Sequence, residues 1–535
     1  MDLTTSTDSS VPREFIAVIL AGYGSGLHPL TSDLGDSACP KALLSIANKP
    51  MIDYTLDWIE QGGVQDVLII CPSTHRAAIS HYIDSEISSS SSLRINIQTH
   101  DEDEETGVGT CAPFRAHAHR ITEDFIVLPC DFVPPPSLPL SKLLNKFRTD
   151  TVTDGAIATS CWFECKSSEK GSYPEEWDTP SSPVPIVWHK PSQSLLHVDS
   201  SDEINRNSDE LELRMSLLNS YPSSKLSSKN QDSGVYVCKR NVLDFLKQKS
   251  EFESFRDEMI PWLCKMQYQR GKRAKYSKAL ENATSSTQYE ALRHSTRHNQ
   301  AGIIIQSQLE SESQANGWPG SPTPDDDSNS FPSTFGVGLV LHELADGPAI
   351  RVNTLAAFAE INRFFLSQIP LQANKEKPPT SEQRIQVSTD SIIGDSTTLD
   401  ERTTIKKTVI GKHCKIGKMV KLTGCVILDH CVIEDGCKLD NCLLGQSTKV
   451  GAKTELSKCV SQPGYEVAAG ESIKGEKLQS SDWTAAPGSS DEDEDDDDED
   501  GSEEDADNDD DEGSSADSEA GTAKTGATAA PNKSE

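Results

Sequence analysis

A glycine-rich segment near the N-terminus is the first candidate for chemistry. It reads LAGYGSGLHPLT over Leu20–Thr31 and is followed by CPKALL over Cys39–Leu44. Glycines such as Gly22 and Gly24 let backbone N–H groups approach a phosphate closely, and Lys41 can supply positive charge. No GK[ST] follows and the GxGxxG pattern is incomplete, so this is neither a Walker loop nor a dinucleotide fingerprint. Spacing alone leaves two interpretations open, a phosphate-binding loop and a plain tight turn.

Alternating strands and helices must position this segment. Short apolar runs predict buried strands over Phe15–Leu20, Val67–Cys71, Leu93–Ile97 and Phe125–Asp131, and helical spacing predicts helices over Met51–Gly62 and Ser73–Ile87. This alternation predicts βαβ units and an α/β, Rossmann-type, mostly parallel sheet. Ligands of such sheets bind at the C-terminal ends of the strands. We therefore expect the glycine loop and Asp131 to meet at that edge.

The domain organisation follows from shifts in composition along the chain. Polar stretches rich in Ser, Glu, Asp and Pro interrupt the first domain and are expected to be surface insertions. Ordered pieces lie between them, including VYVCK over Val235–Lys239 and EMIPWLCKMQYQR over Glu258–Arg270. The expected division is a leader (1–12), a first domain (13–368) with inserts at about 166–184, 199–209 and 279–335, a linker (369–384), a second domain (385–478) and a disordered tail (479–535).

The second domain shows a repeat of 17 residues. Twelve aliphatic anchors recur on it: Ile393, Ile410, Ile427 and Leu444; Leu399, Ile416, Ile433 and Val450; Ile405, Leu422, Leu439 and Leu456. Three strands per coil, each with one inward aliphatic residue, predict a triangular parallel β-helix. Glycines follow several anchors, at Gly394, Gly411, Gly417, Gly445 and Gly451, where we expect corners that need backbone freedom. Ser461 falls on the next lattice position, where we expect the pattern to end.

Composition and charge exclude several classes of protein. The 535 residues carry a net charge of −34. Asp491–Glu535 holds 21 acidic and 2 basic residues, or −19, which leaves −15 for the rest of the chain. This balance argues against direct binding of nucleic acid. No apolar run approaches the length of a membrane span, and the polar N-terminus MDLTTSTDSS does not resemble a secretory signal. We expect a cytosolic protein without a membrane partner.

The acidic tail has two interpretations. It could dock basic partners, and its serines precede acidic residues in the way that acidophilic kinases prefer. It could equally be a solvated segment that only keeps the chain soluble, which is the usual role of such charge runs.

Cysteines and histidines of the second domain raise two further alternatives. Cys425, Cys431 and Cys437 step by six residues, which allows a metal site or, more simply, small buried thiols. His413 and His430 lie 17 residues apart in one lattice column. A histidine base would allow acyl transfer, whereas the simpler interpretation is a column stacked on the surface. The 14 cysteines contain no CxxC pair, and we expect them to be reduced and mostly buried.

Several of these motifs together resemble the nucleotidyltransferases that activate sugar phosphates, whose signature is LAGGxGTRLxPLT followed by PK. In the same comparison Gly109 and Thr110 resemble an element near the base, Asp131 resembles the first magnesium aspartate, and DSGVY over Asp232–Tyr236 resembles a strand of that fold. The resemblance implies a nucleotidyltransferase-like domain followed by a left-handed β-helix. It also implies a nucleotide pocket formed by Gly22, Gly24, Lys41, Gly109, Thr110 and Asp131.

Two departures from the signature argue against catalysis. The loop arginine that stabilises charge on the α-phosphate in those enzymes is matched by Gly26, and the loop is one residue shorter. The second metal-binding aspartate is matched by Arg351, and a cation at that place repels magnesium. Losing one transition-state donor alone typically costs about 10²–10³ in rate. We expect a vestigial pocket, no catalytic residues, no bound metal and no cofactor.

With these losses the chain resembles the family of gamma subunits of eukaryotic translation initiation factor 2B. PKALLSIANKPMIDY, FRDEMIPWL over Phe255–Leu263 and RVNTLAAFAEINR carry that resemblance. It implies a non-catalytic subunit of a guanine-nucleotide exchange complex that releases GDP from initiation factor 2 and lets GTP bind. Its implied partners are the epsilon subunit, the other subunits of the complex and initiation factor 2 as the client GTPase. The alternative is a sugar-phosphate guanylyltransferase, acting on mannose 1-phosphate, or its regulatory homologue.

Overall fold

A computed structural model describes most of the two predicted domains. The described residues are 13–33, 38–87, 91–101, 109–153, 155–165, 177, 184–199, 211, 213–269, 271–273, 275–276, 335–368 and 386–479. The leader 1–12, the linker 369–384 and the tail beyond Gln479 lie outside these ranges. Of the three predicted inserts, the structure describes only Trp177, Val184, Asp199 and Phe335.

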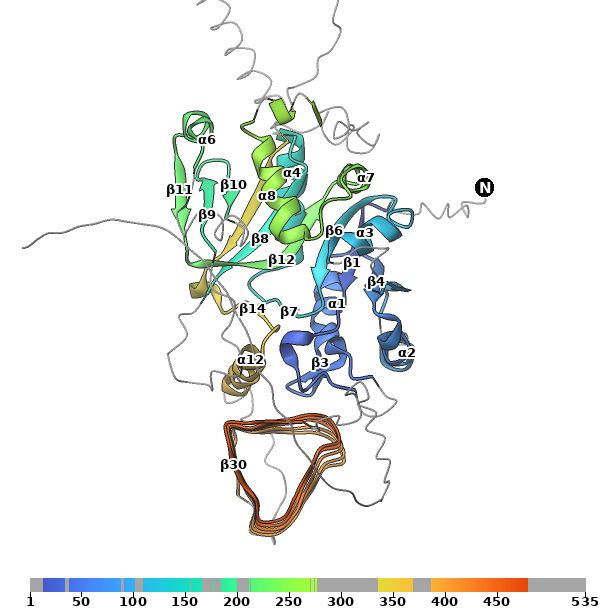
Figure 1. The fold of residues 1–535 in the computed structure, drawn as a ribbon, viewed down its shortest axis with the longest axis vertical. Coiled ribbons are helices and arrows are strands. Elements are labelled where there is room, and N and C mark those ends of the chain that lie inside the picture. Colours follow the sequence, from blue (N-terminus) through green and yellow to red (C-terminus); the bar gives the residue numbers. More distant parts are fainter. Residues whose placement is uncertain are drawn as a thin grey trace, which may run out of the picture. The chain divides into compact units, whose positions relative to one another are not determined.

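The first domain is built on one ten-stranded sheet in the order β11-β9-β10-β13-β8-β12-β6-β1-β4-β5 (Figure 1). Its parallel part contains β1 (Phe15–Leu20), β4 (Asp66–Cys71), β5 (Arg94–Thr99) and β6 (Asp124–Pro129). These are the four strands predicted from the sequence, within two residues at each end. The predicted parallel arrangement around β1 is therefore confirmed.

The rest of the sheet makes it mixed. β12 (Asn230–Cys238) runs antiparallel to both β6 and β8 (Ala158–Glu164), and β13 (Val337–His342) runs parallel to β8. The remaining strands are β9 (Ile186–His189), β10 (Ser194–Val198) and β11 (Ser224–Ser227), joined antiparallel. Two short pairs lie outside this sheet: β2 (Ser45–Ile46) with β3 (Lys49–Pro50), and β7 (Phe132–Val133) with β14 (Ile350–Arg351).

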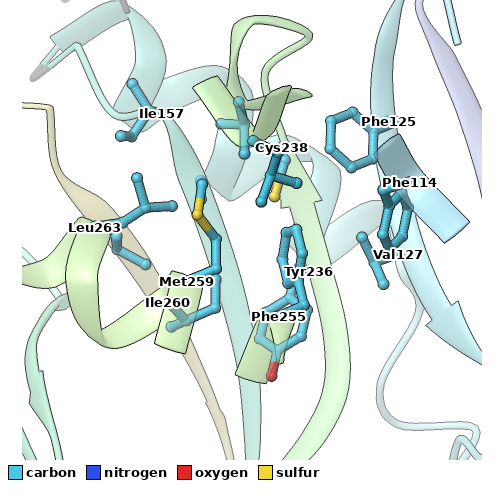
Figure 2. Close-up of a cluster of buried hydrophobic side chains, with 14 of the residues drawn as sticks. Phe114, Phe125, Val127, Ile157, Tyr236, Cys238, Phe255, Met259, Ile260 and Leu263 are labelled. Carbon is cyan, nitrogen blue, oxygen red and sulfur yellow. The ribbon is translucent and has the colours of Figure 1, made fainter. Parts of the chain in front are cut away.

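Helices cover both faces of the sheet, because successive strand residues point to opposite sides. Along β1, Ile16 and Val18 belong to one apolar cluster, whereas Phe15, Ala17 and Ile19 belong to the other. The first cluster contains α3 (Cys111–His117), α7 (Asn241–Gln248) and α8 (Ile260–Met266); part of it is drawn in Figure 2. The second contains α1 (Met51–Gln61), α2 (Ser73–Tyr82) and α4 (Leu140–Thr153).

Among the described residues, this domain also contains two single-turn π-helices and one small helix. Ile83–Ile87 continues α2, so the predicted helix over Ser73–Ile87 is divided into an α and a π segment. Phe255–Met259 precedes α8 in the same way. The small helix is α6 (Met215–Ser220). Within the described ranges, the structure has no helix that combines the length and the apolar composition needed to cross a membrane.

The second domain consists of three stacked parallel sheets, as the 17-residue repeat predicts. The first contains β15 (Gln386–Val387), β18 (Thr404–Lys406), β21 (Lys421–Thr423), β24 (Lys438–Asp440), β27 (Glu455–Ser457) and β30 (Ser472–Lys474). The second contains β16 (Ile392–Ile393), β19 (Val409–Ile410), β22 (Val426–Ile427), β25 (Leu443–Leu444), β28 (Val460–Ser461) and β31 (Lys477–Leu478). The third contains β17 (Thr398–Leu399), β20 (Lys415–Ile416), β23 (Val432–Ile433), β26 (Lys449–Val450) and β29 (Glu466–Val467).

The anchors pair as predicted, but the lattice does not end at Ser461. Ile410 pairs with Ile427 and Leu422 pairs with Leu439, one coil apart. Ser461 pairs with Leu444 inside the coil, where its Oγ accepts a 3.0 Å hydrogen bond from Gly445 N. The Ser461 hydroxyl can lie in the apolar interior because it is hydrogen-bonded. The β-helix continues beyond it for another coil.

The predicted reason for the glycines is also wrong. None of the five glycines after the anchors has a positive φ; the left-handed corner positions are held mostly by other residues, such as Ser396, Arg402 and His413. What Gly411 requires is space, since a Cβ there would lie 2.7 Å from Asp429 N in the next coil. Close stacking of coils, rather than backbone freedom, selects glycine at this place.

One further apolar cluster contains residues of both domains. α12 (Leu355–Gln368) contributes Leu355 and Phe358, and the outer face of the second β-helix sheet contributes Val426 and Leu443. At the same junction, Asn48 Nδ2 donates a 2.8 Å hydrogen bond to the carbonyl oxygen of Ile410. The apolar outer face of that sheet therefore packs against the first domain.

Candidate functional site

A cavity of about 390 Å³ lies at the C-terminal ends of β1 and β6. Five of the six residues predicted for a nucleotide pocket line it: Gly22, Gly24, Lys41, Thr110 and Asp131. The glycine loop and Asp131 thus meet at the expected edge of the sheet. The volume falls within the usual range of small-molecule sites, about 300–1,000 Å³.

Asp131 is bonded to a cation on each carboxylate oxygen. Lys41 Nζ lies 2.5 Å from Oδ2, and Arg351 Nε lies 3.1 Å from Oδ1. The Asp131 side chain is 4% exposed. Burial alone would raise the pKa of Asp131, but the charges and hydrogen bonds of Arg351 and Lys41 outweigh it and hold the pKa below its usual value. The carboxylate therefore stays ionised and internally neutralised.

Backbone pairing between two short strands places Arg351 next to the Asp131 carboxylate. Arg351 in β14 pairs with Phe132 in β7, the residue directly after Asp131. Val352 N also donates a 2.8 Å hydrogen bond to the carbonyl oxygen of Asp131. On the other side, a Cβ at Gly234 would lie 3.3 Å from Arg351 Nη1, so glycine leaves room for the guanidinium.

These residues do not fit a magnesium ion. Magnesium sites in phosphoryl-transfer proteins use one or two carboxylates together with substrate phosphates. Both oxygens of Asp131 are already occupied by cations, and the position of the expected second carboxylate holds Arg351 itself. Across the described ranges, no group of three His, Cys, Asp or Glu side chains is arranged to hold a metal.

At two positions of the glycine loop, neighbouring atoms leave no room for a side chain. Gly24 has φ +82°, and a Cβ there would lie 2.8 Å from Lys41 Cβ. At Gly26 a Cβ would lie 2.2 Å from the carbonyl oxygen of Asn353, so any side chain is excluded there. Gly22 has no atom within 4 Å of its Cβ position and faces open space. The loop thus packs on the segment that follows Arg351.

Gly109 and Thr110 support the cavity wall. Gly109 does not line the cavity; it has φ +92°, and its Cβ would lie 2.6 Å from the carbonyl oxygen of Glu253. Thr110 Oγ1 accepts a 2.8 Å hydrogen bond from Phe255 N, and Cys111 N donates to the Glu253 carbonyl oxygen at 2.8 Å. These bonds tie the start of α3 to the segment before the second π-helix.

That segment also contributes a polar side chain, Arg256, which was not predicted from the sequence. Arg256 lines the cavity with a side chain that is 29% exposed, and its Nε lies 3.7 Å from Asp232 Oδ2. Asp232 is buried and accepts hydrogen bonds from the Tyr236 hydroxyl and from Gly234 N. Burial raises the pKa of Asp232, and Arg256 opposes that shift. Arg256 lies in the FRDEMIPWL motif and Asp232 lies in the DSGVY motif. These two motifs were the only indication in the sequence that the residues belong to the site.

The cysteines and histidines of the β-helix are arranged as the simpler interpretations predict. Cys425, Cys431 and Cys437 are buried inside the coils, where their Sγ atoms donate to backbone carbonyl oxygens. The expected small buried thiols are confirmed for these three. His413 and His430 are exposed, and their rings stack 5.1 Å apart at an interplanar angle of 9°. This is the surface column of the simpler interpretation.

Two family models match the chain. Residues 16–169 match the nucleotidyl transferase model, and residues 373–473 match the model of the left-handed β-helix (LbH) domain of eIF2B subunit epsilon. Together with the three stacked parallel sheets, the second match identifies the C-terminal domain as a left-handed parallel β-helix.

Several curated proteins similar to this chain are subunits of translation initiation factor eIF2B. Translation initiation factor eIF2B subunit gamma of Schizosaccharomyces pombe is 32% identical over 88% of this chain and 90% of its own length. The gamma subunit of Dictyostelium discoideum is 26% identical over 72% of this chain and 84% of its own length. The S. pombe epsilon subunit is 25% identical over 46% of this chain and 34% of its own length.

Proposed function

This chain belongs to the family of eIF2B gamma subunits, and from that premise we propose that it is a non-catalytic subunit of a guanine-nucleotide exchange complex. The complex promotes release of GDP from initiation factor 2 and loading of GTP. An exchange factor makes and breaks no covalent bond, because it only has to stabilise the nucleotide-free GTPase over the GDP-bound form. The subunit pairs with the epsilon subunit in the cytosol, within the complete exchange complex.

Loss of transferase chemistry is part of this proposal. The two cations on Asp131 support it, since they occupy the carboxylate that would hold magnesium. The contact between the Gly26 position and Asn353 supports it as well, because an arginine cannot enter the loop there. The saturated Asp131 is the single observation that carries the loss of catalysis. No observation favours the guanylyltransferase alternative.

The cavity and the domain division complete the proposal. Gly22, Gly24, Lys41, Gly109, Thr110 and Asp131 form or support a vestigial nucleotide pocket. We place the first domain at 13–368 and the β-helix at 385–478, because α12 ends at Gln368 and the first described strand of the β-helix begins at Gln386. Residues 369–384 join the two domains.

Affinity purification of the tagged full-length chain from its own cells, followed by mass spectrometry, tests the assignment. We expect the epsilon subunit, the other exchange-factor subunits and initiation factor 2 to be enriched at least about tenfold over a tag-only control. The matched control variant is Lys49→Ala, which removes one exposed surface charge paired with Asp57 and should recover the same partners. Recovery of homo-oligomers alone would refute the proposal.

A further inference from the structure

We propose that Ser250 is phosphorylated by an acidophilic protein kinase, and that the phosphate weakens the hydrogen bonds between the turn at Ser250 and α3. In this reaction Ser250 Oγ forms a bond to the γ-phosphorus of ATP, while the bond between that phosphorus and the β–γ bridging oxygen breaks. ADP leaves, and the hydroxyl proton passes to the base of the kinase. The inference goes beyond the exchange function and does not depend on the loss of transferase chemistry.

The first step is the sequence around Ser250. It reads KSEFE over Lys249–Glu253, so Glu251 follows the serine directly and Glu253 lies three positions after it. Both glutamates are exposed, and the Glu251 side chain is 80% exposed. Exposed carboxylates at these positions complement the basic substrate groove that defines an acidophilic kinase.

The second step is that the structure separates Ser250 from the other candidate positions. The described Ser and Thr residues with an acidic residue three positions later are Thr99, Thr151, Ser250, Ser254, Thr397 and Thr398. Three of these lie in regular secondary structure: Thr99 in β5, Thr151 in α4 and Thr398 in β17. The hydroxyl of Ser254 donates a 2.9 Å hydrogen bond to Asp257, and that of Thr397 donates one of 2.8 Å to a backbone carbonyl oxygen. Ser250 is exposed and lies outside helix and strand, and its hydroxyl forms no hydrogen bond with another described residue.

The third step is access to the hydroxyl group. Ser250 lies in a turn between α7, which ends at Gln248, and the π-helix over Phe255–Met259. The only described backbone hydrogen bond across this turn runs from Phe252 N to the carbonyl oxygen of Lys249, and at 3.5 Å it is longer than usual. A kinase can therefore extend the segment at little cost in free energy.

The segment directly after the turn is tied to α3. Arg115 Nη1 donates a 2.6 Å hydrogen bond to the carbonyl oxygen of Phe252. The backbone N–H of Cys111, the first residue of α3, donates a 2.8 Å hydrogen bond to the carbonyl oxygen of Glu253. A displacement of the turn is therefore transmitted to the start of α3.

A phosphate at Ser250 favours such a displacement. It adds a charge of about −1.5 to −2 just beyond the C-terminal end of α7, where the helix dipole is already negative. The lysines on either side are each paired with a carboxylate, Lys247 with Asp244 at 3.9 Å and Lys249 with Glu251 at 3.4 Å. The phosphate must compete with these carboxylates for the same cations, and it repels them.

Treatment of the purified full-length chain with casein kinase 2 and ATP, followed by mass spectrometry, tests the site. We expect phosphate at Ser250 and none at the internal controls Thr99, Thr151, Thr397 and Thr398. The serines of the acidic tail show that the kinase is active. Phosphate on the tail without phosphate on Ser250 would overturn the proposal.

Two variants test the recognition of the motif. Glu253→Gln should lower the rate of phosphorylation at Ser250 by about tenfold or more, the usual cost of losing a charge-assisted contact. Glu471→Gln removes an exposed carboxylate of the β-helix and should leave that rate unchanged. An unchanged rate in Glu253→Gln would refute recognition through this motif.

Hydrogen exchange tests the effect on α3. In the phosphorylated chain, the amide of Cys111 should exchange at least about fivefold faster than in the Ser250→Ala chain treated with the same kinase. This control carries any phosphate on the tail but none at Ser250. Equal exchange in the two chains would overturn the proposed weakening of the bonds to α3.

Discussion

Replacing Asp131 with alanine lowers the free energy of unfolding of the first domain by about 3–5 kcal/mol. The Lys41 and Arg351 side chains are only 11% and 22% exposed, and without Asp131 they become neighbouring like charges with no anion between them. Urea denaturation of the purified chain, followed by tryptophan fluorescence, measures the change. Asp57→Ala is the matched control: it breaks an exposed pair with Lys49 and should cost less than about 1 kcal/mol.

The same residue predicts the direction of a pH effect. Because Arg351 and Lys41 lower the pKa of Asp131 in the folded chain, its contribution to stability is fully present above the unfolded pKa of about 3.9. That contribution is lost as the pH falls through the lower, folded pKa. The difference in stability between the unaltered chain and Asp131→Asn should therefore be constant at neutral pH and shrink only in acid. If Asp131→Asn lowered the free energy of unfolding by less than about 1 kcal/mol at neutral pH, the ion pairs of Asp131 would not stabilise the fold as proposed.

Gly26→Arg, the second large effect, destabilises the first domain by about 2–3 kcal/mol, at the upper end of the usual cost of overpacking. A Cβ at this position would lie only 2.2 Å from the carbonyl oxygen of Asn353, which is a severe clash. Because this oxygen belongs to the backbone, it cannot move away by a change of rotamer. The loop or the segment after Arg351 must therefore shift. The variant should gain no transferase activity, although it restores the side chain found in the catalytic enzymes.

Gly22→Arg is the matched control for that change. The same side chain is added to the same loop, but nothing lies within 4 Å of its Cβ position and its φ is not positive. We expect a change below about 0.5 kcal/mol, as for most exposed substitutions. Equal losses for the two variants, measured by the same urea denaturation, would show that the contact with Asn353 does not limit the loop.

The β-helix was predictable almost residue by residue, because its period is set by local geometry. Each coil repeats the same three turns, so an inward residue such as Ile410 meets Ile427 one period later. The details that failed depend on neighbouring coils. Ser461 is accepted inside because Gly445 N lies within bonding distance, and Gly411 is required because the next coil approaches closely. Neither relation is visible in a list of aliphatic positions.

The candidate site was predictable only in part, because its key contact is long-range. The glycine loop, Lys41 and Asp131 could be placed at one sheet edge from the strand pattern. The Arg351 position was matched to a lost metal ligand, but its bond to Asp131 joins residues 220 positions apart through the small β14–β7 pair. Arg256 reaches the cavity from a π-helical turn, for which the sequence offers no periodic signal.

The most direct measurement of the central claim is a transferase assay on the purified full-length chain with GTP, mannose 1-phosphate and magnesium. If Arg351 and Lys41 have replaced the metal at Asp131, GDP-mannose formation should not exceed the level of a reaction containing the Asp131→Asn variant. Robust formation of GDP-mannose by the unaltered chain, abolished in that variant, would contradict the account.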